Sequence, residues 1–204
     1  MELINTCRPD DAATAYSTSL HWLLSVGYRH RPRQGCTCTE QNCPVPGAHP
    51  RPDSPVYVGP ELIVQELEQS PGAGIIAWTT RFDALVLPRS VGLATMAALD
   101  QIAQVPCIVT DDAVTLLVLP ATGRFARTFH PDLEVRSGRS NWIALPPSHG
   151  TRWDTPPWVP QTSTPVALLH GVDVGCRLGG PSSPESSSEL AGSNPLPPTT
   201  TPSE

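Results

Sequence analysis

The chain has 204 residues, of which 39% are hydrophobic and 25 are proline, and its formal net charge is −6. This length allows one domain with its own core, and the proline content predicts long stretches that are neither helix nor central strand. The charge excludes a protein whose whole surface binds nucleic acid, although a local basic face is compatible with it.

The first eleven residues contain no apolar segment, which predicts that the chain has no secretory signal. The longest apolar runs are interrupted by Arg81, Asp83 and Pro88, so we expect no transmembrane helix. Both features predict a cytoplasmic protein with no membrane partner. Paired disulfides are rare in that reducing compartment, so the six cysteines require another explanation.

The N-terminal part is predicted to contain two helices separated by a loop. Apolar residues recur at helical spacing within residues 11–25, and Gly27 stands where a helix-ending glycine belongs. Residues 35–55 have almost no large apolar side chains and no periodicity, which predicts a loop. The dipeptide Gly59-Pro60 favours a second helix through residue 69, with proline in its first turn.

The rest of the sequence alternates pairs of strands with single helices. Strand pairs are predicted at 74–79 and 82–87, at 107–110 and 114–119, and at 133–136 and 142–145. Between the first two pairs, a helix capped by Ser90 is predicted through Gln104. Its predicted inward residues are Leu93, Met96, Ala97, Leu99, Ile102 and Ala103. The expected fold class is α+β, with a mainly antiparallel sheet, flanking helices and a small zinc-knuckle loop.

Three segments are expected along the chain. Residues 1–11 form an N-terminal extension, and residues 12–177 form the domain, which includes the knuckle loop at 35–50. Residues 178–204 are rich in Pro, Ser and Thr and contain no aromatic residue. Such a segment buries too little apolar surface to offset its ordering entropy, so we expect a disordered tail.

Cys36, Cys38, Cys43 and His49 form the clearest chemical motif of the sequence. Three thiols and an imidazole within fourteen residues can surround one tetrahedral ion, and these ligand types favour zinc over magnesium or calcium. With four protein ligands the zinc would be structural, and its binding would supply the folding energy of the loop. The alternative is three reduced surface cysteines and a loop histidine.

A short basic stretch precedes this motif. It contains Arg29, Arg31 and Arg33, and Arg51 follows the cysteines. These arginines are candidates for contacts with phosphate groups. A solvated arginine-rich loop is the equally good alternative.

Three stretches, taken together, resemble a known family. They are the knuckle with its Pro-Gly-x-His-Pro end, the segment Phe82-Asp83-Ala84-Leu85-Val86-Leu87-Pro88, and the segment Asn141-Trp142-Ile143-Ala144-Leu145-Pro146-Pro147-Ser148-His149. They resemble the N-terminal domain of bifunctional DNA primase/polymerases, the prim-pol branch of the archaeo-eukaryotic primase superfamily. The chain is most similar to short actinobacterial versions with a cysteine knuckle, over residues 12 to 160.

For active members, the resemblance implies a pair of divalent metal ions held by three acids, and a histidine that contacts the nucleotide. Two metal ions clamp the attacking and leaving oxygens of phosphoryl transfer and require carboxylate ligands. In this sequence the first two acid positions correspond to Val86 and Pro88, and the histidine position to Thr115. Only the third acid is present, as Glu134, so the resemblance implies a degenerate active site.

Other residues near the family motifs have weaker assignments. Ser148 and His149 are candidates for part of a relic nucleotide pocket. The indoles of Trp142, Trp153 and Trp158 could stack on bases, but core packing is the more frequent role of such residues.

The function expected from the sequence is that of a prim-pol-like protein without catalysis, acting through nucleic-acid or protein binding. Its cofactor would be structural Zn²⁺, and its partners would be DNA, nucleotides, or proteins of replication or mobile elements. One alternative is an active template-dependent primase/polymerase with a rearranged site, which would need Mg²⁺ or Mn²⁺. Another is a zinc-stabilised protein-interaction module.

Overall fold

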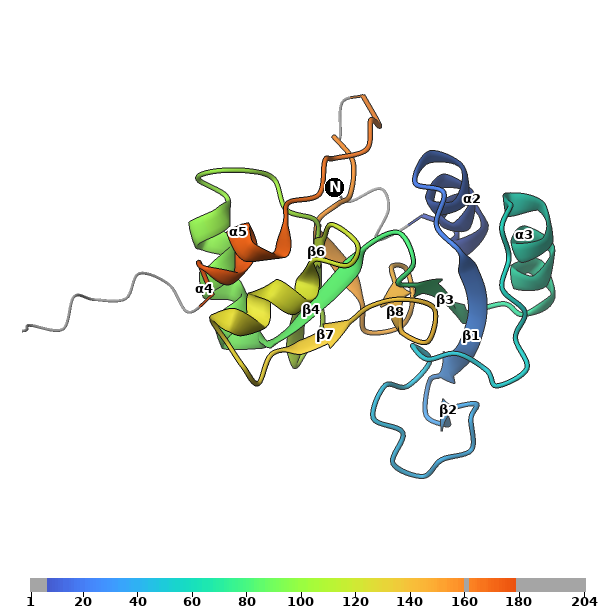
Figure 1. The fold of residues 1–204 in the computed structure, drawn as a ribbon. Coiled ribbons are helices and arrows are strands. Elements are labelled where there is room, and N and C mark those ends of the chain that lie inside the picture. Colours follow the sequence, from blue (N-terminus) through green and yellow to red (C-terminus); the bar gives the residue numbers. More distant parts are fainter. Residues whose placement is uncertain (1–6, 160–161, 179–204) are drawn as a thin grey trace, which may run out of the picture.

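Two antiparallel sheets form the framework of the computed structural model, in which residues 7–159 and 162–178 are described. The first sheet has four strands, in the spatial order β2 (Gly35–Cys36), β1 (Leu24–Arg31), β3 (Ala73–Trp78) and β8 (Trp142–Leu145). Helices α2 (Pro9–Ser19) and α3 (Pro60–Gln69) lie beside it, on the right of Figure 1. Both helices have proline in the first turn, where its missing N–H would have no helical partner.

The second sheet has five strands, in the spatial order β7 (Glu134–Arg136), β4 (Asp83–Pro88), β6 (Ala113–Val118), β5 (Cys107–Val109) and β9 (Arg152–Thr155). Helices α4 (Arg89–Leu99) and α5 (Gly171–Gly175), with the 3-10 helix η1 (Gly123–Thr128), cover one of its faces. Successive β4 residues point to opposite faces of the sheet. Leu85 and Leu87 therefore pack beneath these helices, whereas Ala84 packs into the other core and Val86 lines a cavity.

An aromatic cluster lies at the centre of the first core. Tyr16 stacks on Trp22 with ring centroids 5.8 Å apart, and Trp153 and Trp158 lie beside Tyr16. The Tyr16 hydroxyl donates to the carbonyl of Pro146 at 2.7 Å and accepts from Nε1 of Trp153 at 2.6 Å. Trp153 and Trp158 are therefore core residues, which confirms core packing, and not base stacking, as their role.

The first predicted helix is wrong at its C-terminal end. Helix α2 ends at Ser19, and His21 has a positive φ of 53°, so the backbone leaves the helix there. Leu24 and Val26 instead belong to strand β1, paired with β3. Gly27 does not end a helix. It lies within β1, where an added Cβ would come within 2.6 Å of the His49 carbonyl oxygen.

Two of the three predicted hairpins are also wrong. Strands β3 and β4 follow each other in sequence but belong to different sheets, and so do β7 and β8. The other predicted hairpin, at 107–110 and 114–119, is confirmed, since β5 pairs with β6 around the turn at Asp111 and Asp112. Helix α4 begins at Arg89 with Pro88, not Ser90, as its N-cap, and it ends at Leu99, not at Gln104. Among the side chains predicted to face inward, Leu93, Ala97 and Ile102 are exposed. Strand β9 and helices η1 and α5 were not predicted.

The α+β class with mainly antiparallel strands and flanking helices is confirmed. The predicted N-terminal extension overlaps α2, which begins at Pro9. The tail predicted at 178–204 lies outside the described residues except for Leu178. Within residues 7–159 and 162–178, no helix has the length and apolar character needed to cross a membrane.

Candidate metal centre

The knuckle begins where strand β1 turns back into β2. His30 pairs with Cys36 and Arg31 pairs with Gly35, so the first cysteine is held by the edge of a sheet. The next residue, Thr37, is fixed twice to β1: its amide donates to the Arg29 carbonyl at 3.0 Å, and its hydroxyl accepts from the Arg29 amide at 3.2 Å. These bonds place Cys36 and Cys38 on either side of one anchored residue.

The histidine ligand is presented by a loop that lies against two strands. The Tyr28 amide of β1 donates to the His49 carbonyl at 3.0 Å. Gly47 has a φ of +71°, a conformation that favours glycine, and an added Cβ there would come within 2.5 Å of the His30 amide nitrogen. On the neighbouring strand β3, a Cβ at Gly74 would come within 2.4 Å of the Gly47 carbonyl oxygen. Both glycines therefore permit close backbone contact.

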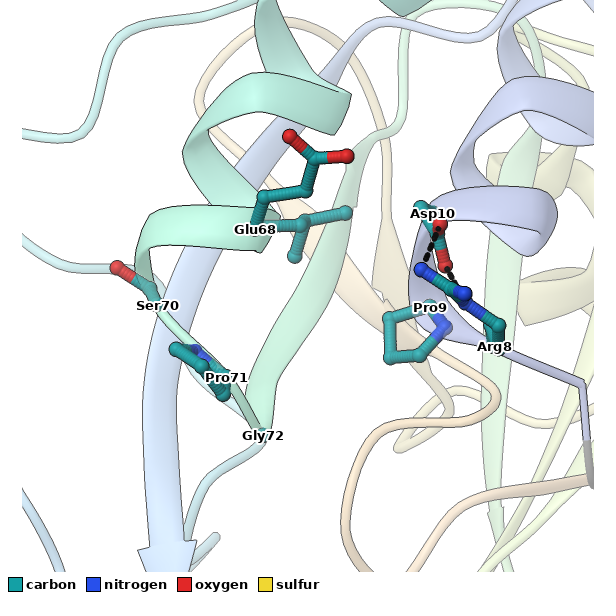
Figure 2. A pocket seen from close by; sticks show the side chains of 8 residues that line it. Arg8, Pro9, Asp10, Glu68, Ser70, Pro71 and Gly72 are labelled. Carbon is teal, nitrogen blue, oxygen red and sulfur yellow. Dashed lines mark hydrogen bonds and ion pairs between the residues drawn. The ribbon is translucent and has the colours of Figure 1, made fainter.

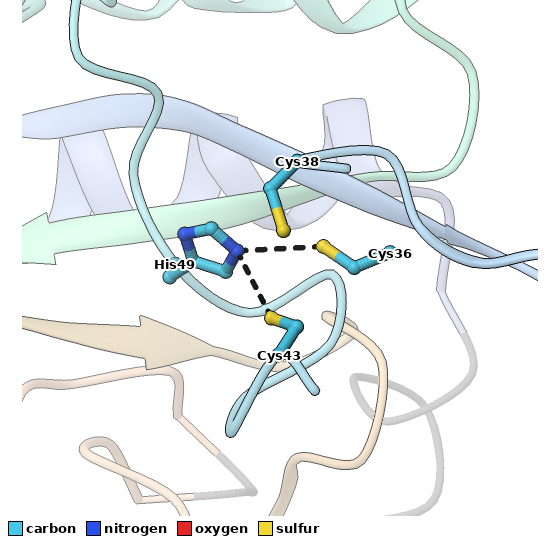
Figure 3. A group of neighbouring side chains, drawn as sticks. All are labelled: Cys36, Cys38, Cys43 and His49. Atoms are coloured by element: carbon cyan, nitrogen blue, oxygen red, sulfur yellow. Dashed lines mark hydrogen bonds between the residues drawn. The ribbon is translucent and has the colours of Figure 1, made fainter. Parts of the chain in front are cut away.

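The four side chains converge on one point (Figure 3). Nε2 of His49 lies 3.4 Å from Sγ of Cys36 and 3.3 Å from Sγ of Cys43. All four potential ligand atoms lie within 4.8 Å of one another, and each residue is half-buried. Bond lengths of about 2.0–2.3 Å in a tetrahedral zinc site imply ligand-to-ligand distances of about 3.6–3.8 Å. The cluster therefore needs only small adjustments to surround one ion.

The electrostatics of the cluster favour a thiolate at Cys36. Burial opposes ionisation of this thiol, but hydrogen bonds from the amides of Cys38 and Gly47 outweigh it and lower the pKa of Cys36 to about 6. Burial raises the pKa of the Cys43 thiol to about 11, and the neighbouring Cys36 adds to this shift. One strong ligand is thus ionised near neutral pH, and a cation would favour ionisation of the others.

The predicted metal-binding cluster is therefore present as a group of four converging side chains. Three sulfur atoms and one imidazole nitrogen can bind a metal ion such as zinc. Because the protein itself supplies four ligands, a tetrahedral ion here would have no open position for a substrate. The cluster can support the structure of the loop and offers no catalytic centre.

The structure separates the three arginines predicted to contact nucleic acid. Arg29 and Arg31 line a cavity with Arg51, whereas Arg33 is exposed in the turn after β1, with a φ of 67°. Arg29 Nη1 donates to the carbonyl of Pro71 at 3.3 Å.

Ser148 and His149 have different surroundings although they are adjacent. Ser148 is buried, and its hydroxyl accepts from the Ile75 amide at 2.8 Å and donates to the Ile75 carbonyl at 3.2 Å. His149 stacks on His30 and lines a cavity. A nucleotide-binding role for either residue stays a prediction.

Three of the positions singled out by the sequence resemblance lie side by side. Val86 of β4 pairs with Glu134 of β7 on one side and with Thr115 of β6 on the other. Residues directly opposite each other in adjacent strands project from the same face, so these three side chains form one row across the sheet. Glu134 is exposed and accepts from Arg136 Nε at 2.7 Å. Pro88 lies two residues beyond Val86, at the exposed end of β4.

A cavity of about 330 Å³ lies over part of this row. Val86, Thr115 and Ile108 line it from the second sheet, and Trp142 and Ile143 line it from β8. The knuckle contributes a rim. The knuckle residues that line the cavity are Pro44, Val45, Pro46 and Ala48.

Charged side chains also line this cavity, with both signs represented. The charged and titratable residues are Arg136, His149, Asp111 and Asp112. The sequence did not single out Arg136, whose guanidinium lies 5.5 Å from the Trp142 ring centroid. Its position two residues after Glu134 on a strand, hence on the same face, is the signal that could have found it.

Asp83 serves a structural purpose, and period-two alternation places it on the opposite face of β4 from Val86. Its carboxylate accepts from the Gly123 amide at 2.8 Å and from the Ser137 hydroxyl at 2.6 Å, and the residue is buried. Asp83 thus ties η1 and the β7–β8 connection to β4.

A further cavity of about 300 Å³ lies between the start of α2 and the end of α3 (Figure 2). Arg8 and Asp10 line it and bind each other, with a shortest distance of 2.8 Å. This hydrogen bond lowers the pKa of the Asp10 carboxyl group. Arg8 and Asp10 neutralise each other, which leaves Glu68 as the other charged residue among the described residues that line this cavity.

Comparison of the chain with family models, with curated proteins and with solved structures finds no match.

Proposed function

We propose that this chain is a prim-pol-like domain without polymerase chemistry, which binds single-stranded nucleic acid in the cavity beside a zinc knuckle. The observation that carries the proposal is the row Glu134, Val86 and Thr115, of which Val86 and Thr115 line that cavity. The resemblance assigns two metal-binding acids and a nucleotide-binding histidine to these positions, and the strand register brings all three together.

The side chains in this row argue against catalysis. Two-metal phosphoryl transfer needs several carboxylate oxygens around the ions, because divalent magnesium and manganese prefer oxygen ligands. Val86 offers no ligand atom, Thr115 has no charge, and Glu134 is paired with Arg136. One paired carboxylate is a poor basis for a two-metal site.

The cavity nevertheless suits a base and its sugar-phosphate. Trp142 supplies an aromatic ring, and Val86 and Ile108 supply apolar surface. Arg136 and His149 supply donors for a phosphate or for base edges, and Asp111 and Asp112 at the same cavity supply acceptors for the amino groups of bases. Aromatic stacking combined with basic groups is the usual way in which proteins hold single strands without strong sequence preference.

In this proposal the metal is zinc, and its role is to shape the rim of the cavity. The loop residues Pro44, Val45 and Pro46 lie between the ligands Cys43 and His49 and line the cavity. They belong to a loop with few apolar residues, so ligation of its two ends restricts their movement.

Binding can be tested with a fluorescein-labelled single-stranded oligonucleotide and fluorescence anisotropy. Stacking on one aromatic ring contributes about 1–3 kcal/mol, so we expect Trp142→Ala to weaken binding by about 5- to 150-fold. Phe125→Ala is the matched control, because Phe125 is an exposed aromatic residue on η1, outside the cavity.

Two further outcomes decide between the proposal and its alternatives. We expect no template-dependent nucleotide incorporation with Mg²⁺ or Mn²⁺, and robust synthesis that is lost in Glu134→Ala would establish an active polymerase instead. Failure of the zinc-loaded protein to bind any single-stranded or duplex probe would favour the zinc-stabilised protein-interaction module.

A further inference from the structure

A basic cavity, of about 270 Å³, lies where strand β1 meets the end of α3. Arg29, Arg31 and Arg51 line it, together with the hydroxyl-bearing residues Thr37 and Ser70. No aspartate or glutamate is among the described residues that line it. Three guanidinium groups and two hydroxyl groups around one hollow form a set of donors suited to an oxyanion.

An irregularity in β1 explains why Arg29 and Arg31 lie on the face of the strand next to α3. Val26 pairs with Ile75 and Arg29 pairs with Ala73, so three residues of β1 correspond to two of β3. This bulge reverses the alternation of side chains along the strand. Arg29 therefore lies on the same face as Val26, next to α3, and Arg31 follows on that face two residues later.

The charge balance at this cavity is positive. Among the described residues, the Arg29 and Arg31 guanidinium groups donate to neutral oxygens, the Pro71 carbonyl and Oε1 of Gln34, both at 3.3 Å. Arg51 is ion-paired with Glu66. A guanidinium has five N–H donors, so Arg29 and Arg31 each keep several for a ligand.

We propose that Arg29, Arg31 and Arg51 form a phosphate-binding pocket that holds one backbone phosphate of single-stranded nucleic acid. The identification of nucleic acid as the ligand rests on the proposed function. Arginine binds phosphate through paired N–H donors, and the Thr37 and Ser70 hydroxyls add neutral donors. Phosphate contacts of this kind fix the position of a strand and carry no sequence preference.

The pocket is coupled to the metal centre through the chain itself. Thr37 lies between the ligands Cys36 and Cys38, and Arg51 lies two residues after the ligand His49. The Thr37–Arg29 backbone bonds connect the cluster to the pocket directly. Release of the metal would loosen the segments that carry Thr37 and Arg51. We therefore expect phosphate binding to require a metal ion in the knuckle.

The test compares the double variant Arg29→Gln/Arg31→Gln with Arg33→Gln, using the labelled oligonucleotide over a series of salt concentrations. Arg33 is the matched control because it lies in the same basic stretch but does not line the pocket. We expect the double variant to bind about tenfold more weakly, with a slope of log K against log salt shallower by about 0.7, the value for one phosphate of a single strand. Arg33→Gln should keep the wild-type slope.

A second measurement examines the pocket without nucleic acid. Inorganic pyrophosphate, titrated into the protein, should shift the NMR amide signals of Arg29 and Thr37 in the wild type and not in the double variant. Removal of zinc with a chelator should abolish these shifts, and addition of zinc should restore them.

The outcomes separate the two proposals. If the double variant and Arg33→Gln bind the oligonucleotide equally well, the pocket assignment is overturned and nucleic-acid binding stands. If no oligonucleotide binds, the proposed function fails. The pyrophosphate shifts then show by themselves whether the pocket binds phosphate. Shifts that persist in the double variant would overturn the pocket.

Discussion

The imidazole rings of His30 and His149 stack with their centroids 3.7 Å apart and their planes 11° from parallel. His30 belongs to β1, next to the knuckle, and His149 follows β8 and lines the cavity to which Val86 and Thr115 also contribute. The stack therefore connects the strand next to the candidate metal cluster with the wall of the proposed nucleic-acid site. Its charge state matters for both.

Acidification should weaken this connection. Burial and the adjacent His30 lower the pKa of His149 below its ordinary value of 6.5, although Asp111 acts in the opposite direction. The unfolded chain then binds more protons than the folded one, so the free energy of unfolding should fall as the pH drops through 6.5 towards the folded-state pKa. Denaturant melts at several pH values should show this fall.

The histidine contribution is isolated by comparing variants. The His149→Gln variant lacks the titrating ring, so its free energy of unfolding should change less than that of the wild type over the same pH range. His21→Asn should keep the wild-type profile, because His21 is exposed and asparagine tolerates its positive φ. Equal pH profiles for the wild type and His149→Gln would contradict this interpretation.

Removal of one ligand should abolish tight zinc binding. Cys43→Ser keeps the size of the side chain and removes a soft donor. Changes around a metal site that spare its ligands cost about 10–100-fold in affinity, so we expect loss of a ligand to exceed about 100-fold. Zinc stoichiometry after dialysis against a competing chelator measures this. Cys176→Ser should retain one zinc, because Cys176 is exposed and outside the cluster.

A substitution in the row can test its geometry. Val86→Asp places a second carboxylate directly opposite Glu134, so we expect weak Mn²⁺ binding that the wild type lacks. The electron paramagnetic resonance signal of free Mn²⁺ should decrease on addition of this variant. The double variant Val86→Asp/Glu134→Gln is the control and should leave the signal unchanged. Equal Mn²⁺ binding by both variants would show that the two side chains do not meet.

Ser148 distinguishes a structural role from a ligand-binding one. Ser148→Ala removes both hydrogen bonds to Ile75 and leaves buried backbone groups unsatisfied, which costs about 1–3 kcal/mol of stability. Affinity for the oligonucleotide should stay unchanged at a temperature where the variant is folded. Ser90→Ala, at an exposed position, should change neither quantity. Weaker oligonucleotide binding by folded Ser148→Ala would restore the predicted nucleotide contact.

The metal cluster was predictable because its information is local. Ligand type and close sequence spacing identify Cys36, Cys38, Cys43 and His49 without any knowledge of the sheets. The same holds for α3, which begins at a first-turn proline, and for the hairpin around Asp111, since aspartate is favoured in turns.

Features that depend on distant strands were missed. The local sequence pattern indicates that 73–78 and 83–88 are strands, but it does not indicate their pairing partners. Strand β3 pairs with β1 and β8, whereas β4 pairs with β6 and β7. The arginine pocket was hidden for the same reason. The alternation of side chains along β1 does not reveal the bulge before Arg29, because a bulge is defined by the pairing of β1 with β3.

The close approach of the knuckle loop to Gly74 bears on how such a site could be transferred to another protein. The fourteen-residue segment that carries the candidate ligands does not contain all the contacts that orient them. The loop also packs against β3 at Gly74, where the absence of a side chain permits the close contact. Grafted onto a different scaffold, the peptide would keep its ligands and lose its orientation. Evolution or design would have to move the knuckle together with two strands.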